Sequence, residues 1–308
     1  MATKTSNSAP WEKAKVIVTG ARGFIGAHLV RLLVERRADV VATSRSAGAG
    51  NDLGVRWIRI DPSDIDEVRR AFAASRPDYV FHLSSLADGR PDVNLVAPTV
   101  RAELLSTVNV LTVAAEFGVR RLVLPGSLEE PDPGAAPSSP YAAAKGASRL
   151  YARMFHQLYG LPVVTARIFM TYGPGQPDWK LIPSVAKALL SGVPPRIGSP
   201  DRPVDWIYIS DVVEGLVRMA EAPGIEGRTL DLGNGTLTTV RQVVEILREL
   251  CRSSVDPVFA AAPVRPFERV ACADLDATVE ALRWRPQVAL RDGLARALEA
   301  LRREQGTK

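Results

Sequence analysis

Hydrophobic residues along this chain fall in short runs separated by longer stretches with helical periodicity. Residues 16–19 form the first run, four apolar or β-branched side chains of the kind found in a short buried strand. Residues 27–37 follow, with Leu29, Leu32 and Leu33 on one face of a predicted helix. The chain is therefore expected to begin with a strand that leads directly into a helix.

The same alternation continues along the first half of the chain. Further strands are predicted over residues 39–43, 56–60, 78–83, 121–124 and 163–169, and helices over residues 62–74, 98–117 and 141–159. Strands that alternate with helices build a parallel sheet covered on both faces. The predicted fold class is therefore α/β, a Rossmann-type doubly wound parallel sheet.

The second half of the chain has a different pattern. Prolines cluster between residues 194 and 203, and one short strand is predicted at 230–233 with helices over 240–250 and 290–303. No repeat or low-complexity linker separates the halves. We expect a loose tail over residues 1–14, a Rossmann-type domain over residues 15–170, and a small C-terminal lobe over residues 171–308, interleaved with that domain as one structural unit.

Three glycines stand between the first predicted strand and its helix. Gly20, Gly23 and Gly26 recur at three-residue spacing, which lets the backbone turn and approach a ligand closely. The N-terminus of the following helix offers free N–H groups and a positive dipole end to a pyrophosphate. Such glycines also suit a plain turn, but the strand–loop–helix context favours a dinucleotide site. The residues expected to contact the dinucleotide in this loop are Gly20, Arg22, Gly23, Phe24 and Ile25.

The end of the second predicted strand bears on the choice of cofactor. Ser44, Arg45 and Ser46 stand where an acidic residue would hold the 2′-hydroxyl of an adenosine ribose. An arginine at this place accommodates a 2′-phosphate instead, and Arg22 offers a second cation. The sequence therefore favours NADP(H), with NAD(H) possible; the alternative is that Arg45 is simply a solvated loop residue.

Two further strand ends supply candidate cofactor contacts. Asp61 follows the third predicted strand and is expected to accept a hydrogen bond from an adenine amino group. Leu83, Ser84 and Ser85 follow the fourth, where small residues allow the loop to approach the cofactor. His82 lies within that strand and is expected to be a core histidine rather than a catalyst.

Composition argues against several other classes of function. The 308 residues are 46% hydrophobic and 24% charged, as in ordinary globular proteins, and the net charge of +5 is not gathered in a basic run. Two cysteines and three histidines show no metal-ligand spacing, so neither a metal site nor a disulfide framework is expected. No apolar segment reaches membrane-spanning length, and the start lacks an apolar signal core. We expect a cytoplasmic protein that binds neither nucleic acid nor a membrane.

A tyrosine and a lysine four residues apart carry the candidate chemistry. Tyr141 and Lys145 begin the predicted helix over 141–159, where this spacing puts phenol and ammonium on one face. A nearby cation lowers the pKa of a phenol and makes it a usable general acid or base. Lys145 also offers a contact to a nicotinamide ribose. Ser127, at the carboxyl end of the fifth strand, is expected to bond the oxygen being interconverted. Such a Tyr–Lys pair also occurs on solvated helices, but the glycine loop and Ser127 favour catalysis.

With these motifs the sequence resembles the extended short-chain dehydrogenase/reductase family of nucleotide-sugar epimerases, dehydratases and reductases. The resemblance covers nearly the whole chain. The matching segments are T-G-A-R-G-F-I-G at 19–26, F-H-L at 81–83, T-V-N at 107–109, Ser127, Y-A-A-A-K at 141–145, R-I-F-M-T-Y-G-P-G-Q at 167–176, D-W-I-Y-I-S-D at 205–211, L-G-N-G at 232–235, R-P at 265–266 and L-R-W-R-P at 282–286.

The resemblance implies a hydride exchanged between a nicotinamide and a sugar carbon. Tyr141 would move the hydroxyl proton, Lys145 would lower the pKa of that phenol, and Ser127 would orient the oxygen. The C-terminal lobe would hold the diphosphate of a nucleotide-sugar, with Arg265 as a candidate phosphate ligand. Many relatives dimerise through the two helices that correspond to residues 98–117 and 141–159, which implies a homodimer.

Three positions depart from the family pattern. Glu103 stands where relatives commonly carry Asn, and Met170 also replaces an Asn. Val204 replaces an Arg that contacts phosphate, so Arg202 is a candidate to substitute for it. Together these departures indicate a reshaped substrate pocket.

The residues after Ser127 bear on which reaction is expected. Residues 126–130, G-S-L-E-E, resemble the G-S-S-E-E stretch of GDP-4-keto-6-deoxymannose reductases, whereas 4,6-dehydratases carry a glutamate here that removes a C5 proton. Glu129 therefore suits a reductase, as a rim residue, or a dehydratase, as a base. The NADP-like strand end favours an NADPH-dependent 4-ketoreductase of a nucleotide-activated deoxysugar. An epimerase or 4,6-dehydratase with retained NAD(P) is the alternative, and a non-catalytic dinucleotide-binding sensor is a minor one.

Overall fold

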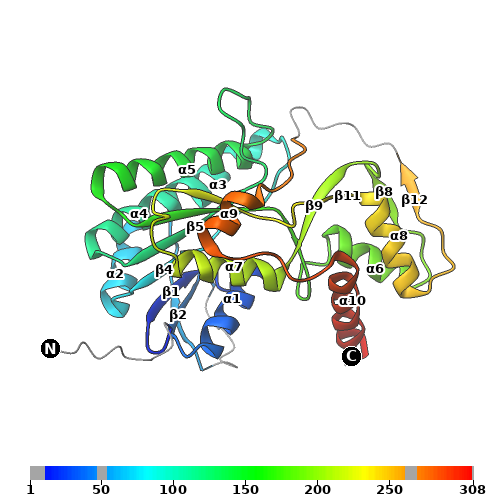
Figure 1. Ribbon diagram of the computed structural model, residues 1–308, viewed down its shortest axis with the longest axis horizontal. Helices are drawn as coiled ribbons and strands as arrows, with labels where there is room; N and C mark the ends of the chain where they lie inside the picture. The colour runs from blue at the N-terminus through cyan, green and yellow to red at the C-terminus, as the bar shows by residue number, and fades with distance from the viewer. Residues whose placement is uncertain (1–10, 47–53, 261–268, 307–308) are drawn as a thin grey trace. The chain divides into compact units, whose positions relative to one another are not determined.

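The computed structural model describes residues 11–46, 54–260 and 269–306 (Figure 1). The chain divides into two compact units, each of which draws on segments far apart in the sequence. The first unit comprises residues 1–126, 139–166 and 216–229, and the second comprises residues 127–138, 167–215 and 230–308. Their internal architectures differ.

Most strands of the first unit belong to one seven-stranded sheet. Its strand order is β10-β6-β5-β4-β1-β2-β3. The strands are β1 (Lys15–Thr19), β2 (Asp39–Ser44), β3 (Arg56–Arg59), β4 (Tyr79–His82), β5 (Arg121–Ser127), β6 (Val163–Ile168) and β10 (Thr229–Leu232). Strand β1 pairs in parallel with β2 and β4, so that Ile17 stands beside both Val41 and Val80. The parallel order confirms the predicted Rossmann-type fold class.

Helices cover both faces of this sheet within the first unit. The helices α2 (Ile65–Ser75), α4 (Ser106–Phe117) and α5 (Pro140–Tyr159) contact one another in series on one face, and α1 (Phe24–Glu35) lies on the other (Figure 1). The core beneath α2, α4 and α5 includes Ile17, Phe72, Leu111 and Leu122, all at most 1% exposed. The apolar runs found in the sequence are therefore the strands and inner helix faces that bury this core.

Two helices begin at other residues than predicted. The first was expected over 27–37, but α1 starts at Phe24, directly after Gly23. A Cβ at Gly26 would lie 2.2 Å from the carbonyl oxygen of Gly20, so glycine here lets the first helical turn sit against the loop. The second was expected from residue 62, but α2 starts at Ile65 because the Asp64 carboxylate caps it, accepting from the backbone N–H groups of Asp66 and Glu67.

The predicted helix over 98–117 is interrupted by a π-helical turn. It follows a 3₁₀ turn η1 (Val93–Leu95) and consists of α3 (Val96–Thr99), the π-helical η2 (Val100–Leu105) and then α4. The hydroxyls of Ser106 and Thr107 donate to the carbonyls of Ala102 and Glu103, both at 2.6 Å. These bonds satisfy carbonyls in the wide turn, and such turns occur preferentially at functional sites.

The second unit is built of short strands and amphipathic helices. A three-stranded sheet has the order β11-β9-β7, and a two-stranded sheet pairs β12 with β8. Its elements are β7 (Met170–Tyr172), α6 (Leu181–Leu190), β8 (Arg196–Gly198), β9 (Pro203–Tyr208), the first part of α7 (Ile209–Glu221), β11 (Leu237–Thr239), α8 (Val240–Cys251), β12 (Val258–Ala260), α9 (Leu275–Leu282) and α10 (Leu290–Gly306). Helices α6, α8 and α10 contact one another, and their shared core includes Ala186, Leu298 and Leu301. The long helices α8 and α10 were predicted, whereas the three-residue strands are too short to show a pattern.

Candidate active site

The glycine loop between β1 and α1 is shaped by close backbone approach. Gly20 has φ +64°, and a Cβ there would lie 2.5 Å from the backbone carbonyl of Leu83. Strand β4 ends at this point, where Leu83 N–H donates to the Thr19 carbonyl at 3.2 Å. A side chain at Gly20 would therefore push the loop away from the neighbouring strand end.

The N-terminus of α1 presents unfilled hydrogen-bond donors. Gly23 is its N-cap residue and supplies no side-chain cap, and the first turn carries no acidic residue. Phe24 and Ile25 are half-buried in that turn. Free N–H groups at the positive end of a helix dipole, next to glycines without side chains, fit the pyrophosphate of a dinucleotide.

Arg22 and two serines meet at the end of β2. An Arg22 guanidinium N–H donates to Ser46 Oγ at 3.1 Å, and the Ser44 and Ser46 hydroxyls are 3.1 Å apart. The same guanidinium lies 5.7 Å from the centroid of the Trp57 ring. Arg45 is exposed, and its backbone carbonyl accepts a bond from the Arg59 side chain at 3.2 Å. The structure thus places the Arg22 guanidinium beside two serine hydroxyls at the end of β2, and Arg45 lies between those serines in the chain.

Asp61 accepts hydrogen bonds and forms an ion pair within the first unit. Its carboxylate accepts from Ser63 N at 3.0 Å and Ser63 Oγ at 2.8 Å, and forms an ion pair with Arg101 at 3.3 Å. Burial acts to raise the pKa of Asp61, but the Ser63 bonds and the charge of Arg101 outweigh it, and the pKa is lowered. Asp61 is therefore ionised and half-exposed, a state that leaves acceptor capacity for a further donor.

In the loop after β4, Ser84 N–H donates to Thr19 Oγ1, and Ser85 is exposed.

Tyr141 and Lys145 share one face of α5, as predicted. Ser139 caps this helix by accepting from Ala142 N–H at 3.1 Å, and Pro140 occupies its first turn. The ammonium of Lys145 lies 5.7 Å from the centroid of the Tyr141 ring. Lys145 is buried, with 5% of its side chain exposed, whereas Tyr141 is half-buried. The geometry supports a cation that acts on the phenol.

A carboxylate that the sequence patterns did not assign to the site binds Lys145. Glu103 Oε2 lies 2.8 Å from Lys145 Nζ, and the Glu103 side chain is 1% exposed. Lys145 Nζ also donates to the Pro125 carbonyl at 3.1 Å. The available signal was an acidic residue in a helical stretch rich in apolar residues, because a charged group is seldom buried without a partner.

His82 is a core histidine, as expected, and it lies near the buried Lys145 ammonium. Thr19 Oγ1 lies 2.8 Å from Nδ1, and Ser106 Oγ lies 3.4 Å from Nε2. The Ser106 hydroxyl proton is directed to the Ala102 carbonyl, which assigns the imidazole proton to Nε2. Burial and the positive charge of Lys145 lower the pKa of His82 to about 3. His82 is therefore neutral near pH 7.

The second unit holds the other predicted catalytic residues. Ser127 is the last residue of β5 and 7% exposed; its hydroxyl accepts from Glu129 N–H at 3.2 Å. Its own N–H donates to Glu130 Oε1 at 2.8 Å, and Glu130 is 2% exposed. Glu129 is half-buried. Glu130 therefore has a local structural role that leaves Glu129 as the more accessible carboxylate.

Of the two predicted phosphate ligands, Arg202 lies within the described residues and Arg265 lies outside them. Arg202 is half-buried between β8 and β9, where its N–H donates to the Ser199 carbonyl and its carbonyl accepts from Val240 N–H. Nearby on β9, Asp205 is 2% exposed and gathers backbone donors from Asn234, Gly235 and Ala273.

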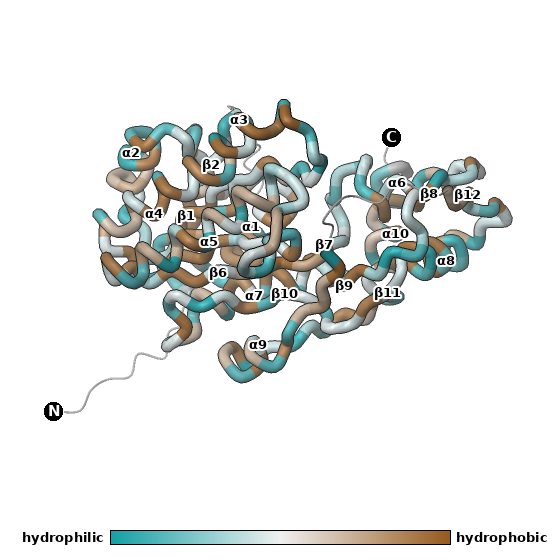
Figure 2. Tube along the Cα trace, turned by 90° about the horizontal axis from the view of Figure 1, so that it is seen from above, coloured by the Kyte–Doolittle hydropathy of each residue, from teal (hydrophilic) through white to brown (hydrophobic). Residues whose placement is uncertain are grey.

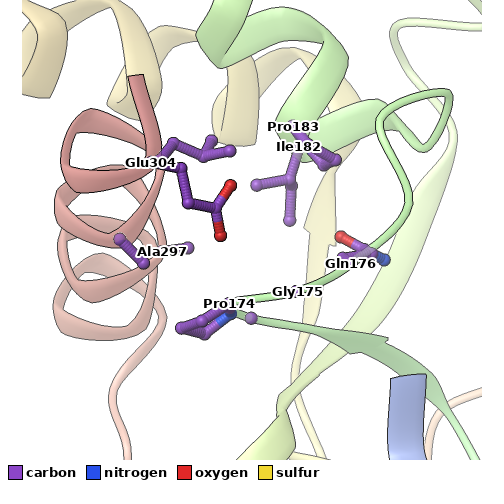
Figure 3. A pocket seen from close by; sticks show the side chains of 10 residues that line it. Pro174, Gly175, Gln176, Ile182, Pro183, Ala297 and Glu304 are labelled. Carbon is purple, nitrogen blue, oxygen red and sulfur yellow. The ribbon is translucent and has the colours of Figure 1, made fainter. Parts of the chain in front are cut away.

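A small pocket in the second unit contains none of the predicted site residues. It lies between the loop after β7, α6 and α10, with Gln176, Ile182 and Glu304 on its walls (Figure 3). Within the described ranges, no group of acidic, histidine or cysteine side chains is arranged to hold a metal ion. Nor does any described helix combine the length and apolar character needed to cross a bilayer.

Comparison with known proteins gives this arrangement a family. A model of the NAD dependent epimerase/dehydratase family matches residues 16–233. A dTDP-glucose 4,6-dehydratase of an Actinoplanes species is 30% identical over 309 residues, or 91% of this chain and 95% of that protein.

Solved structures agree with the family model. The UDP-glucose 4-epimerase of Thermotoga maritima, solved with UDP-glucose, has a TM-score of 0.86 at 25% identity, over 94% of this chain and 99% of its own. MoeE5, solved with UDP-glucose and NAD, has a TM-score of 0.83 at 30% identity, over 95% of this chain and 100% of its own. The chain therefore belongs to the NAD dependent epimerase/dehydratase family, within the extended short-chain dehydrogenases/reductases, and is an NAD(P)-dependent enzyme.

Proposed function

We propose that this enzyme is an NADPH-dependent 4-ketoreductase of a nucleotide-activated deoxysugar. A nucleotide-sugar substrate is supported by the relatives, because the Thermotoga maritima epimerase and MoeE5 were both solved with UDP-glucose. The dinucleotide, when bound, exchanges a hydride with a sugar carbon. The second unit is proposed to hold the nucleotide diphosphate, with Arg202 and Arg265 as phosphate ligands.

The chain's own residues handle the proton. Tyr141 Oη donates a proton to the sugar oxygen in the reductive direction and accepts it in the oxidative one. Lys145, buried 5.7 Å from the Tyr141 ring centroid, stabilises negative charge on the phenolate. Ser127 is proposed to hold the sugar oxygen by a hydrogen bond, and Glu129 to stand at the rim of the site.

The observation that carries the cofactor preference is the end of β2. Arg22 donates to Ser46 Oγ at 3.1 Å, with Ser44 bonded to the same serine and Arg45 beside it. Cations and hydroxyls suit a 2′-phosphate, whereas a ribose 2′-hydroxyl is held by a carboxylate. MoeE5 was solved with NAD, so NAD(H) is the competing assignment.

A second candidate function is an epimerase or 4,6-dehydratase that retains its cofactor. Glu129, half-buried and bonded through its N–H to the Ser127 hydroxyl, supports it because removal of a C5 proton needs a carboxylate near the sugar. The Actinoplanes relative is a dTDP-glucose 4,6-dehydratase. In this reading Glu129 is the base rather than a rim residue.

Cofactor retention separates the two candidates. The purified protein is denatured, any released nicotinamide nucleotide is identified, and the emptied protein is titrated with NADPH and NADH. For the reductase we expect little retained cofactor, tighter NADPH binding, and NADPH oxidised in proportion to product with GDP-4-keto-6-deoxymannose as the probe. Stoichiometric retained NAD, with turnover of UDP-glucose or dTDP-glucose and no net cofactor change, would establish the second candidate instead.

We also propose that the chain forms a homodimer through η1, α3, η2 and α5. Large apolar side chains are exposed there: Val93 (80%), Val96 (46%), Val100 (46%), Leu150 (60%) and Leu158 (68%). The apolar stretch at α3 is brown in Figure 2, and α3 contacts α5 within the first unit. Exposed apolar patches of this kind mark interfaces. Light scattering should give twice the chain mass of 33.3 kDa, and Leu150→Arg should shift the protein toward monomer.

A further inference from the structure

The carboxylate of Glu103 is matched to two donors at once. Oε2 binds Lys145 Nζ at 2.8 Å, and Oε1 accepts from the backbone N–H of Leu86, in the loop after β4. A carboxylate offers two acceptor oxygens, whereas an amide offers one oxygen and an NH₂ donor. Asn or Gln at this position would leave one of the two donors facing another donor. The geometry therefore selects a charged carboxylate.

The π turn places this carboxylate. Glu103 lies within η2, and its backbone carbonyl is bonded by the Thr107 hydroxyl at 2.6 Å. Helix α5 contacts η2 along this stretch, and Lys145 projects from α5. With side chains 1% and 5% exposed, Glu103 and Lys145 are held out of solvent, where charge interactions are strong.

The charge of the buried group can be counted. Three titratable groups that the described contacts place near Lys145 Nζ are Glu103 from η2, Tyr141 from α5 and His82 from β4; β5 contributes the Pro125 carbonyl. His82 is neutral, since burial and Lys145 lower its pKa to about 3. The charges of Glu103 and Lys145 therefore sum to zero beside the Tyr141 phenol.

We propose that Glu103 is a positioning residue for catalysis: it fixes Lys145 against the loop after β4 and, by offsetting the ammonium charge, raises the pH at which the Tyr141–Lys145 pair gives up its first proton. This inference rests on the proposed roles of Tyr141 and Lys145. Removal of a negative charge always favours loss of a proton from a neighbouring coupled pair. The direction of the effect is therefore fixed whichever member of the pair loses the proton.

The ionisation of Tyr141 can be measured without any substrate. Tyrosinate absorbance is recorded against pH for the full-length protein and for Tyr141→Phe, and the difference isolates Tyr141. The same difference is taken in a Glu103→Gln background. We expect the midpoint of Tyr141 ionisation to be lower in the Glu103→Gln background by about one pH unit, the effect of one charge at this range. A midpoint that stays in place or rises would overturn the proposal.

Glu116→Gln is the matched control. Glu116 lies on α4, the continuation of the same helical stretch, and pairs with Arg69 at 2.9 Å in a half-exposed bridge. The Glu116→Gln substitution removes the same charge from an exposed position, so we expect no measurable change in the midpoint of Tyr141 ionisation. Glu103→Asn serves as a second test variant. If neither Glu103 variant folds while Glu116→Gln does, Glu103 is a structural residue and the proposal is wrong.

Catalytic turnover separates this inference from the proposed function. If NADPH oxidation with GDP-4-keto-6-deoxymannose fails in wild type but the Tyr141 midpoint moves as expected, the proposed reaction is wrong and Glu103 retains its role. If turnover is found and the midpoint does not move, only the role of Glu103 is wrong.

Discussion

Glu103 in the first unit and Asp205 in the second are both buried carboxylates that accept several hydrogen bonds, but their donors differ in kind. In the first unit, Glu103 binds the Lys145 ammonium and one backbone N–H. In the second unit, Asp205 accepts backbone N–H groups from Asn234, Gly235 and Ala273 at 2.6, 3.0 and 2.9 Å. A carboxylate that binds a cation sets the local charge of its site. One that accepts from backbone N–H groups holds chain segments together. We therefore expect changes in the first site to alter chemistry and changes in the second to alter stability.

Tyr141→Phe should have the largest effect, and it should fall on activity alone. Loss of the phenolic proton donor is expected to lower turnover by about 10³-fold, within the range for general acid–base groups. The half-buried ring stays in place, so the free energy of unfolding should change little. The measurements are NADPH oxidation and urea unfolding. Unchanged turnover would mean that Tyr141 is not the proton donor.

Asp205→Asn should show the opposite behaviour, a loss of stability. The amide keeps one acceptor oxygen and turns an NH₂ donor toward N–H groups that the carboxylate had satisfied. We expect unfolding to become easier by about 2–4 kcal/mol, the cost of unmet buried donors. Asp201→Asn, 80% exposed and paired with Arg241, is the control and should change stability by less than about 0.5 kcal/mol. Equal effects from both substitutions would remove the special role of Asp205.

His82 should make the protein less stable at mildly acidic pH. Its pKa falls from 6.5 to about 3 on folding because of burial and the nearby Lys145 charge. The unfolded chain therefore binds a proton between these values that the folded chain does not, so stability is full above pH 6.5 and falls as the pH drops toward 3. This histidine should remove about 2 kcal/mol between pH 7 and pH 5.

Urea unfolding at pH 7 and at pH 5 measures this contribution of His82 to stability. His82→Gln should flatten the difference, because the group with the lowered pKa is then gone. An equally steep pH dependence in His82→Gln would assign acid sensitivity to other groups.

Arg22→Ala should have the smallest effect and sharpen the cofactor assignment. Removal of the guanidinium beside Ser46 should weaken NADPH binding about tenfold and leave NADH binding nearly unchanged, because only NADPH carries the 2′-phosphate. Fluorescence titration measures both affinities. Arg31→Ala removes a charge from the exposed face of α1 and should affect neither cofactor. An equal loss for both cofactors would place Arg22 at the shared pyrophosphate.

Several features were accessible from sequence because they depend on local chemistry. The strand β1, the glycine loop and the Tyr141–Lys145 spacing each follow from periodicity or from the geometry of one helix. The start of α1 was misplaced by three residues because Gly26 was assigned to the loop, although it lies within the helix. The π turn of η2 was also not predicted, since its hydrogen bonds depend on the Ser106 and Thr107 hydroxyls.

By itself, the sequence determined the alternation of strands and helices, the glycine loop and the Tyr141–Lys145 helix face, because these arise from residues close together in the chain. Only the tertiary structure decided that Glu103 is the partner of Lys145, and that Asp205 joins the segments at 234–235 and 272–273. Those contacts join residues distant in sequence, and a buried carboxylate takes its role from whichever donors the folded chain brings to it.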